Sequence, residues 1–185
     1  MPAADEQQLI TEVQQGSHDA FRLLVERHMR QAYDVAFGIL GNHHDADDAT
    51  QEAFVKAYRS ISSFRSASSF GTWLYRIVTN ESLNRVKRSK RKQRNEVQLE
   101  HAENETVSYQ MSSMTIDDTQ RYLERALHEL PTLQRAVVML RHLNGLSTHQ
   151  VSRILECSEG TVKTHLHRGL KKMRERLEFL KEDMA

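Results

Sequence analysis

The sequence predicts an all-α protein, made of two small helical domains joined by an acidic flexible linker. Its 185 residues include only two prolines and seven glycines, which is little turn material for a sheet-rich fold. Hydrophobic residues recur every three or four positions over most of the chain, as on one face of a helix. A polar, acidic stretch interrupts this pattern. We therefore expect domains at residues 1–94 and 117–185, with the linker at 95–116.

Four helices are expected in the first domain. A short helix stops near Gly16, a long amphipathic helix breaks at Gly41, and a third reaches about Ser60. After a loop rich in serine, a fourth helix starts at Phe70 and runs into a basic stretch that ends at Arg94. The apolar positions that predict them are Leu9, Ile10 and Val13; Phe21, Leu24, Val25, Met29, Tyr33, Ala36, Phe37 and Leu40; Ala46, Ala49, Ala53, Phe54 and Ala57; and Phe70, Trp73, Leu74, Ile77 and Val78.

The second domain shows helix signals at shorter intervals. Pro131 suits the first position of a helix, and Ser147 with Gln150 forms a capping-box pattern for a short helix. Ser158 is placed to cap the last helix. The apolar positions that mark these helices are Leu123, Leu127 and Leu130; Leu133, Val137 and Leu140, which are expected to line an inner face; Val151, Ile154 and Leu155; and Val162, Leu166, Leu170, Met173, Leu177 and Leu180, which are expected to be buried.

Composition excludes several classes of protein. No apolar run approaches the roughly 20 residues of a membrane span, and the N-terminus lacks the apolar stretch of a signal peptide, so we expect a cytoplasmic protein. The single cysteine, Cys157, cannot form an internal disulfide or a cysteine zinc cluster, and we expect it to be a small core residue. The net charge of +1 hides strong segregation: residues 1–58 carry ten acids and four bases, whereas residues 59–94 carry ten bases and one acid.

The C-terminal segment has the pattern of a DNA-binding helix-turn-helix. A short helix, a tight turn and a longer basic helix allow one helix to brace while the next enters the major groove. Opposite the apolar stripe of the last helix, the exposed face holds Thr164, Arg168 and Lys171, flanked by Gly160, Thr161, Lys163 and His167. The alternative is a solvated basic helix, and the pattern does not separate base contacts from phosphate contacts.

Two further surfaces stand out in the first domain. Asp48, Gln51, Glu52 and Val55 share one face of the third helix, which suits a basic partner helix or a plain acidic surface. Aromatic residues crowd the serine-rich loop just before a block of seven bases. There Phe64 can stack on an unpaired base, whereas Phe70 and Trp73 fit the core. The basic block suits phosphate contacts or a solvated tail.

Four separated motifs resemble the extracytoplasmic-function group of the sigma-70 family of bacterial sigma factors, in the family's order and along nearly the whole chain. They are QQGSHDAFRLLVERH, DADDATQEAFVKAYRSISSFR, FGTWLYRIVTNESLNRVKR and LPTLQRAVVMLRHLNGLSTHQVSRILECSEGTVKTHLHRGLKKMRERL. One departure is that Ala49 and Thr50 precede Gln51, where the family usually has larger aliphatic residues. The resemblance implies a region 2-like first domain and a region 4-like second domain in an alternative sigma factor. Such a protein directs promoter-specific transcription initiation and is not an enzyme, and we expect no cofactor or metal.

The resemblance also implies roles for the surfaces above. The acidic face formed by Asp48, Gln51, Glu52 and Val55 docks on the clamp helices of the largest subunit of core RNA polymerase. The loop from Phe64 to Ser69, with Asn80, captures a flipped base of the promoter minus-ten element. The full minus-ten set is Phe64, Arg65, Ser66, Ser68, Tyr75, Arg76, Asn80, Asn84, Arg85, Lys87 and Arg88. The minus-thirty-five set is Gly160, Thr161, Lys163, Thr164, His167, Arg168 and Lys171.

Other partners and rival functions complete the expectations. The resemblance implies control by an anti-sigma factor, often membrane-bound, in a stress or envelope response, and no small-molecule substrate. A simple repressor would share the helix-turn-helix but would not need the aromatic loop or the acidic face. A metal protein is the second rival, because His43, His44, Asp45, Asp47 and Asp48 lie close in sequence, although Asp47 and Asp48 diverge by about 100° on a helix.

Overall fold

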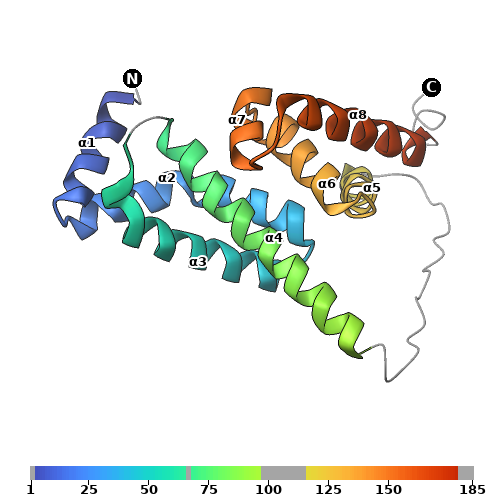
Figure 1. Cartoon of the computed structure of the whole chain (residues 1–185), viewed down its shortest axis with the longest axis horizontal. Helices are drawn as coiled ribbons and strands as arrows, with labels where there is room; N and C mark the ends of the chain where they lie inside the picture. Colours follow the sequence, from blue (N-terminus) through green and yellow to red (C-terminus); the bar gives the residue numbers. More distant parts are fainter. Residues whose placement is uncertain (1–2, 66–67, 97–115, 179–185) are drawn as a thin grey trace.

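The computed structural model describes residues 3–65, 68–96 and 116–178, and every element within these ranges is helical. This confirms the predicted fold class. Figure 1 shows the helices in two groups, with α4 running along the first group and the C-terminal helices beside it. The elements are α1 (Ala3–Gln14), α2 (His18–Leu40), α3 (His43–Ser60), η1 (Ile61–Ser63), α4 (Phe70–Glu96), α5 (Ile116–His128), α6 (Thr132–Val138), η2 (Met139–Leu143), α7 (Thr148–Ile154) and α8 (Glu159–Arg176).

The N-terminal unit is built from α2, α3 and α4, which pack on one another, with α1 against α2. Four alanines of α3 are fully buried, and their small side chains let this helix lie close to its neighbours: Ala46, Ala49, Ala53 and Ala57. Met29, one of the apolar positions that predict α2, is 40% exposed. His28 and Ala32 turn toward the core instead, so the buried face of α2 leaves Met29 at its edge.

Glycines and capping residues end these helices where the sequence indicates. Gly16 and Gly41 adopt positive φ angles of 98° and 84°, which residues with a side chain rarely adopt. The Gly41 backbone N–H donates to the carbonyl of Phe37 and closes α2. Asn42 then caps α3, because its side-chain oxygen accepts from the backbone N–H of Asp45 at 2.8 Å.

The C-terminal unit packs α6 and α7 against α8, around the fully buried side chains of Val137, Leu140 and Val162. The capping box of Ser147 and Gln150 is present, as predicted. Pro131 precedes α6 as its N-cap residue, one position earlier than predicted.

The predicted burial of Leu133 is wrong, because this residue is 47% exposed, and Leu123 of α5 is 44% exposed. Helix α6 lies between α8 and α2, and residues 134–138 are all buried between these two neighbours. Leu133 therefore falls on the side of α6 that remains open to solvent. The C-terminal residue of the predicted apolar stripe, Leu180, lies outside the described residues.

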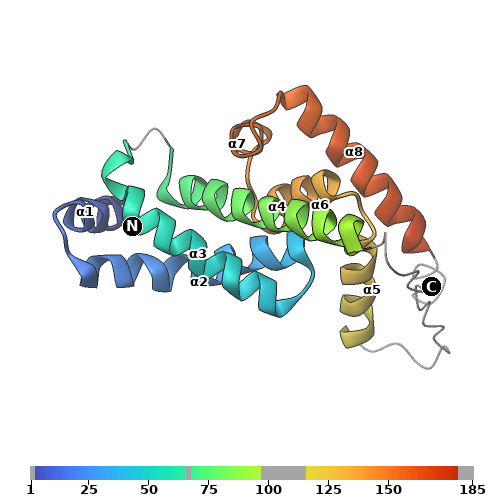
Figure 2. The same ribbon diagram turned by 60° about the horizontal axis from the view of Figure 1, so that its bottom comes forward.

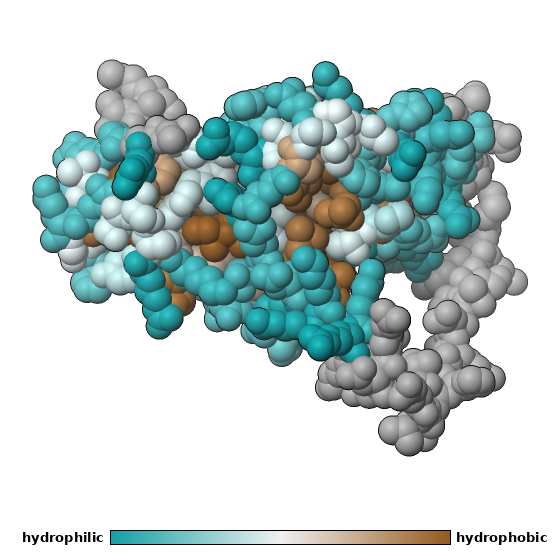
Figure 3. All heavy atoms as spheres, in the orientation of Figure 1, coloured by the Kyte–Doolittle hydropathy of each residue, from teal (hydrophilic) through white to brown (hydrophobic). Residues whose placement is uncertain are grey.

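The two units pack directly against each other. A Cβ atom built on Gly38 of α2 would collide with the Met139 side chain, and one on Gly41 would lie 2.6 Å from the His128 ring. The His128 ring also meets Phe37 edge-on, at 6.1 Å between ring centroids. Burial, followed by the nearby Arg135 guanidinium, lowers the pKa of His128. Figure 3 shows apolar residues in the middle of the face viewed in Figure 1, surrounded by hydrophilic residues.

The predicted acidic linker lies mostly outside the described residues. Helix α4 extends to Glu96, and α5 begins at Ile116, so helix covers both ends of the stretch assigned to the linker. The charge of the intervening segment is known from the sequence alone.

Candidate polymerase-binding and nucleic-acid surfaces

The acidic face of α3 is open to solvent. The side chains of Asp48 and Glu52 are 46% and 44% exposed, and Val55 is a large apolar residue that is 48% exposed. Gln51 is exposed between them. The face lies opposite the buried alanines, so the packing of α3 on α2 and α4 turns these side chains outward. Two carboxylates, an amide and an exposed apolar residue thus form one surface, named the acidic face below.

Arg85 of α4 pairs with this acidic face. Its guanidinium lies 3.1 Å from Oε2 of Glu52 and 3.4 Å from Oδ2 of Asp48, and its side chain is only 25% exposed. Sequence reasoning grouped Arg85 with the phosphate contacts of the basic stretch. In this structure its charge is directed at carboxylates, because the register of α3 on α4 places both acids beside it.

The aromatic residues before the basic stretch form a packed cluster. Phe64 is 7% and Phe70 1% exposed, and the ring centroid of Trp73 lies 5.2 Å from that of Phe64 and 5.7 Å from that of Phe70. The expectation of an accessible Phe64 is therefore wrong for this conformation, since its ring has no free face for a base. Phe64 instead supports the loop from within. Phe70 is in the core, as expected.

Sequence reasoning missed a contact that holds this loop. The Gln14 side chain of α1 donates hydrogen bonds to the carbonyl oxygens of Ile61, at 2.9 Å, and Phe64, at 3.1 Å. These two bonds tie the start of the loop to α1. A glutamine near a helix end carries no sequence signal for such a long-range contact. Ser69, the last residue of the predicted loop, accepts from the backbone N–H of Thr72 at the start of α4 through its hydroxyl.

Tyr75 lies in the core and not on the predicted DNA face. It is 5% exposed, and its hydroxyl donates to the Gln31 side chain of α2. Burial, together with Glu6 and Asp34, raises the pKa of Tyr75 to about 12. Tyr75 lies on the side of α4 that packs against α2, so its ring is buried between the two helices.

An exposed polar stripe remains on α4 and in the loop before it. Arg76, Asn80, Asn84 and Lys87 fall within about 80° of one another at 100° per residue, and all four are exposed. Arg65, Ser68 and Arg88 are exposed as well, whereas Ser66 lies outside the described residues. The surviving stripe, named the α4 stripe below, offers cationic and amide groups to a nucleic-acid strand.

Helices α7 and α8 form the helix-turn-helix. The Ser158 hydroxyl accepts from the backbone N–H of Thr161 at 3.0 Å and caps α8. In the turn before it, Glu156 adopts a positive φ of 52°. All seven residues of the predicted minus-thirty-five set are exposed on α8: Gly160, Thr161, Lys163, Thr164, His167, Arg168 and Lys171. The cap and the buried Val162 thus fix a helix whose open face is polar and basic.

The helix-turn-helix rests on the N-terminal half of α4. The Gln150 side chain of α7 donates to the Thr72 hydroxyl at 3.2 Å, and Arg76 forms an ion pair with Glu156. Figure 2 shows α7 beside this half of α4, with α8 leading away from it. In this compact arrangement the first part of the α4 stripe faces the second unit.

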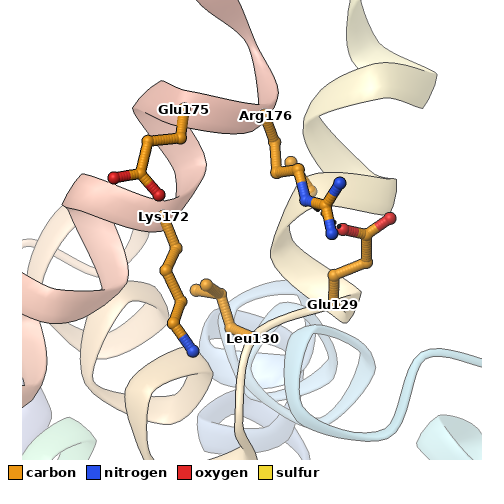
Figure 4. A pocket seen from close by; sticks show the side chains of 6 residues that line it. Glu129, Leu130, Lys172, Glu175 and Arg176 are labelled. Atoms are coloured by element: carbon orange, nitrogen blue, oxygen red, sulfur yellow. Dashed lines mark ion pairs between the residues drawn. The ribbon is translucent and has the colours of Figure 1, made fainter.

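A hollow of about 370 Å³ lies between α8 and the segment that joins α5 to α6. Leu130 and Ala126 line it together with charged residues, among which Arg176 pairs with Glu129 at 2.8 Å. Figure 4 shows Lys172 of α8 extending toward Leu130, and Glu175 of the same helix also lines the hollow. The mixed charges and small apolar area do not indicate a particular ligand.

The histidines near the start of α3 are engaged with neighbouring side chains. His43 pairs with the Tyr33 hydroxyl and stacks on Phe37 at 4.6 Å, and Nδ1 of His44 lies 3.7 Å from Oδ2 of Asp48. Within residues 3–65, 68–96 and 116–178, no group of three potential ligands is placed to hold a metal ion. In the same ranges, no helix is long and apolar enough to cross a membrane.

Cys157 lies in the helix-turn-helix turn, half-buried against the core, and burial raises the pKa of its thiol. Because the thiolate is the reactive form, we expect iodoacetamide to alkylate Cys157 at pH 7.5 at least about threefold more slowly than a cysteine in a short peptide. The rate is measured by mass spectrometry against pH, with the urea-unfolded protein as control. A folded-protein rate equal to that of the peptide would contradict this expectation.

Two family models match the chain: Sigma-70 region 2 at residues 24–92 and Sigma-70, region 4 at residues 120–173. Among curated proteins, the ECF RNA polymerase sigma factor SigW of Bacillus subtilis is 32% identical over 182 residues, covering 92% of this chain and 96% of that protein. The ECF RNA polymerase sigma-E factor of Haemophilus influenzae is 36% identical over 172 residues, covering 89% and 90%.

Two solved structures share the fold. One is the sigma factor RpoE of Bartonella quintana in complex with the anti-sigma factor NepR, with a TM-score of 0.69, 23% identity, and coverage of 85% of this chain and 96% of that one. The other is CnrH in complex with the cytosolic domain of CnrY, with a TM-score of 0.68, 23% identity, and coverage of 94% and 97%. At this identity they support the fold.

Proposed function

Because the chain belongs to the extracytoplasmic-function sigma factors of the sigma-70 family, we propose that it binds core RNA polymerase and directs initiation at a specific set of promoters. The observation that carries this proposal is the match to region 2 and region 4 in one chain. A simple repressor needs only the second. The protein is a specificity factor for transcription, and we propose that it has no catalytic site, cofactor or metal of its own.

The first unit, residues 1–94, is proposed to dock on polymerase and engage the minus-ten element. The acidic face of Asp48, Gln51, Glu52 and Val55 suits basic clamp helices of the largest subunit, because exposed carboxylates steer a cationic partner and an exposed valine supplies apolar contact. An acidic surface that serves only solubility would not need the exposed valine.

For the minus-ten element we propose the exposed α4 stripe and loop residues: Arg65, Ser68, Arg76, Asn80, Asn84, Lys87 and Arg88. The cations hold backbone phosphates, and the amides suit base edges of an opened strand. Ser66 completes this set by its place in the loop sequence. Phe64 and Tyr75 are reassigned to supporting roles, since both are buried.

The second unit, residues 117–185, is proposed to read the minus-thirty-five element with α8, while residues 95–116 join the two units. The N-terminus of α8 presents backbone N–H groups that favour phosphate, and Arg168 and Lys171 lie on the exposed face beyond it. Bracing by α7 keeps this face in one orientation.

We also propose control by an anti-sigma factor in the cytoplasm, with membrane attachment supplied by that partner and a role in a stress or envelope response. Support comes from the two structural neighbours, which were each solved with a partner protein: the anti-sigma factor NepR in one and the cytosolic domain of CnrY in the other. No small-molecule substrate is proposed.

Run-off transcription tests this function. Core RNA polymerase, genomic fragments and the purified protein should give discrete transcripts that core alone does not produce, and mapping their starts reveals both promoter elements. If the protein neither binds core nor yields specific starts, the proposed function is wrong.

Replacing Arg168 with alanine should reduce initiation mainly at promoters that depend on the upstream element, by roughly 5- to 150-fold if the side chain makes a bidentate base contact. The ratio of transcripts from promoters with and without that element measures the effect. Arg153, exposed on α7 outside the proposed face, provides the matched control. An unchanged ratio in the Arg168→Ala variant would remove Arg168 from the reading face.

A further inference from the structure

Arg85 differs from the bases that follow it on α4. Lys87 and Arg88 are exposed, whereas the Arg85 side chain is three-quarters buried, with an exposed fraction of 25%. Three carboxylates approach its guanidinium, from Glu52 at 3.1 Å, Asp48 at 3.4 Å and Asp45 at 3.9 Å. An arginine so surrounded has its charge largely compensated, so it attracts a phosphate much less than an exposed neighbour does.

These ion pairs engage one oxygen of each carboxylate and leave the other oxygen free to face outward. Arg85 reaches Asp48 through Oδ2 and Glu52 through Oε2, with one guanidinium nitrogen for each. Both acids nevertheless remain nearly half exposed. A planar guanidinium therefore orients two carboxylates at once, while their second oxygens stay available to a partner.

Without Arg85, the side chains of Asp48 and Glu52 would no longer be held in one conformation. Asp48 and Glu52 stand at i and i+4 on α3, where like charges repel. Each side chain would then sample several rotamers, and a partner would have to order them on binding. Ordering each side chain at an interface costs conformational entropy, so we expect two freed carboxylates to weaken binding by roughly tenfold.

We propose that Arg85 is a positioning residue of the polymerase-binding surface, which holds Asp48 and Glu52 in the orientation that core RNA polymerase meets, and that it is not a phosphate contact. This inference rests on the proposed function, since it assigns a task to Arg85 within the acidic face. It separates α4 into a bridging residue at Arg85 and a DNA-facing stripe that includes Lys87.

The test compares Arg85→Gln with Lys87→Gln, a matched loss of one positive charge on the same helix. Core RNA polymerase is immobilised, and association and dissociation rates are measured in 0.2 M salt or higher, about where the screening length falls below 8 Å and long-range attraction to the acidic face is weak. We expect Arg85→Gln to dissociate roughly tenfold faster with a nearly unchanged association rate, and Lys87→Gln to behave as the unaltered protein.

A second measurement separates positioning from DNA contact. Binding of a fluorescent single-stranded oligonucleotide of mixed sequence is titrated over a range of salt concentrations. Loss of one phosphate contact reduces the slope of log K against log salt by about 0.7. We expect this reduction in Lys87→Gln and an unchanged slope in Arg85→Gln. Arg85→Lys, which keeps the charge but not the two-nitrogen fork, should give an intermediate dissociation rate.

Each other outcome overturns the inference. A reduced DNA slope in Arg85→Gln makes Arg85 a phosphate contact, and unchanged or slower dissociation from core means that it does not organise the acidic face. Equal thermal unfolding of Arg85→Gln and Arg85→Lys shows that any difference between them is not loss of folding. If the unaltered protein fails to bind core, the proposed function itself fails, which is a separate result.

Discussion

Replacing Phe70 with alanine should lower the free energy of unfolding by about 3–5 kcal/mol. Its ring is 1% exposed and packs against Trp73, Phe64 and His28, with ring centroids 5.7, 6.1 and 5.2 Å away. Truncation leaves a cavity that these rigid rings cannot fill without moving. Urea denaturation followed by circular dichroism measures the loss.

The same change should impair promoter opening before it unfolds the protein. Phe64 loses one wall of its pocket, so the loop that follows it is no longer held in place. Permanganate footprinting of open complexes, at a temperature where the variant is folded, measures this effect. Met29→Ala is the control, because its exposed site on α2 predicts a change within about 0.5 kcal/mol. A Phe70→Ala loss below about 1 kcal/mol would refute the cavity argument.

Replacing Gly38 with valine should separate the two helical units. A Cβ at this position would overlap three atoms of the Met139 side chain. Overpacking of this kind costs typically about 1–3 kcal/mol. Relief by separation leaves each unit's own helices intact, so we expect an unchanged helical signal together with a larger radius of gyration in small-angle X-ray scattering.

A second substitution tests the cause. Met139→Ala makes room for the introduced valine side chain in the Gly38→Val background, so the double variant should be more compact than Gly38→Val alone. Separation also releases Arg76 from Glu156, which should increase hydrogen exchange in α7. A Gly38→Val scattering profile identical to that of the unaltered protein would mean that the interface accommodates the side chain.

The helices and their ends follow closely from local signals. Glycines at 16 and 41, the Asn42 cap and the capping box at Ser147 each act through neighbouring backbone groups, so the sequence nearby contains the necessary information. The exposed faces of α3 and α8 were predictable from local sequence too. Apolar residues spaced three or four apart mark the buried side of each helix, and the exposed side lies opposite it.

Contacts between distant elements were not predictable in this way. Periodicity assigned Leu133 to the core, but the position of α6 between α2 and α8 determines which of its sides is covered. Phe64 and Tyr75 are aromatic residues near a basic stretch, as base-stacking residues often are. Phe64 is nevertheless buried against Trp73, and Tyr75 is buried with its hydroxyl bonded to Gln31. Arg85 sits in a basic run, and only the register of α3 on α4 reveals its acidic partners.

The contact of Gly38 with Met139 joins positions roughly 100 residues apart, and at a synthesis rate of about 5–20 residues per second the later residue follows roughly 5–20 s after the earlier one. During that interval η2 has not yet been made, so the surface of α2 around Gly38 that contacts Met139 stays uncovered. Once α4 is complete, the first unit must therefore hold together through its own α2, α3 and α4 packing until η2 emerges, and the compact form arises only near the end of translation.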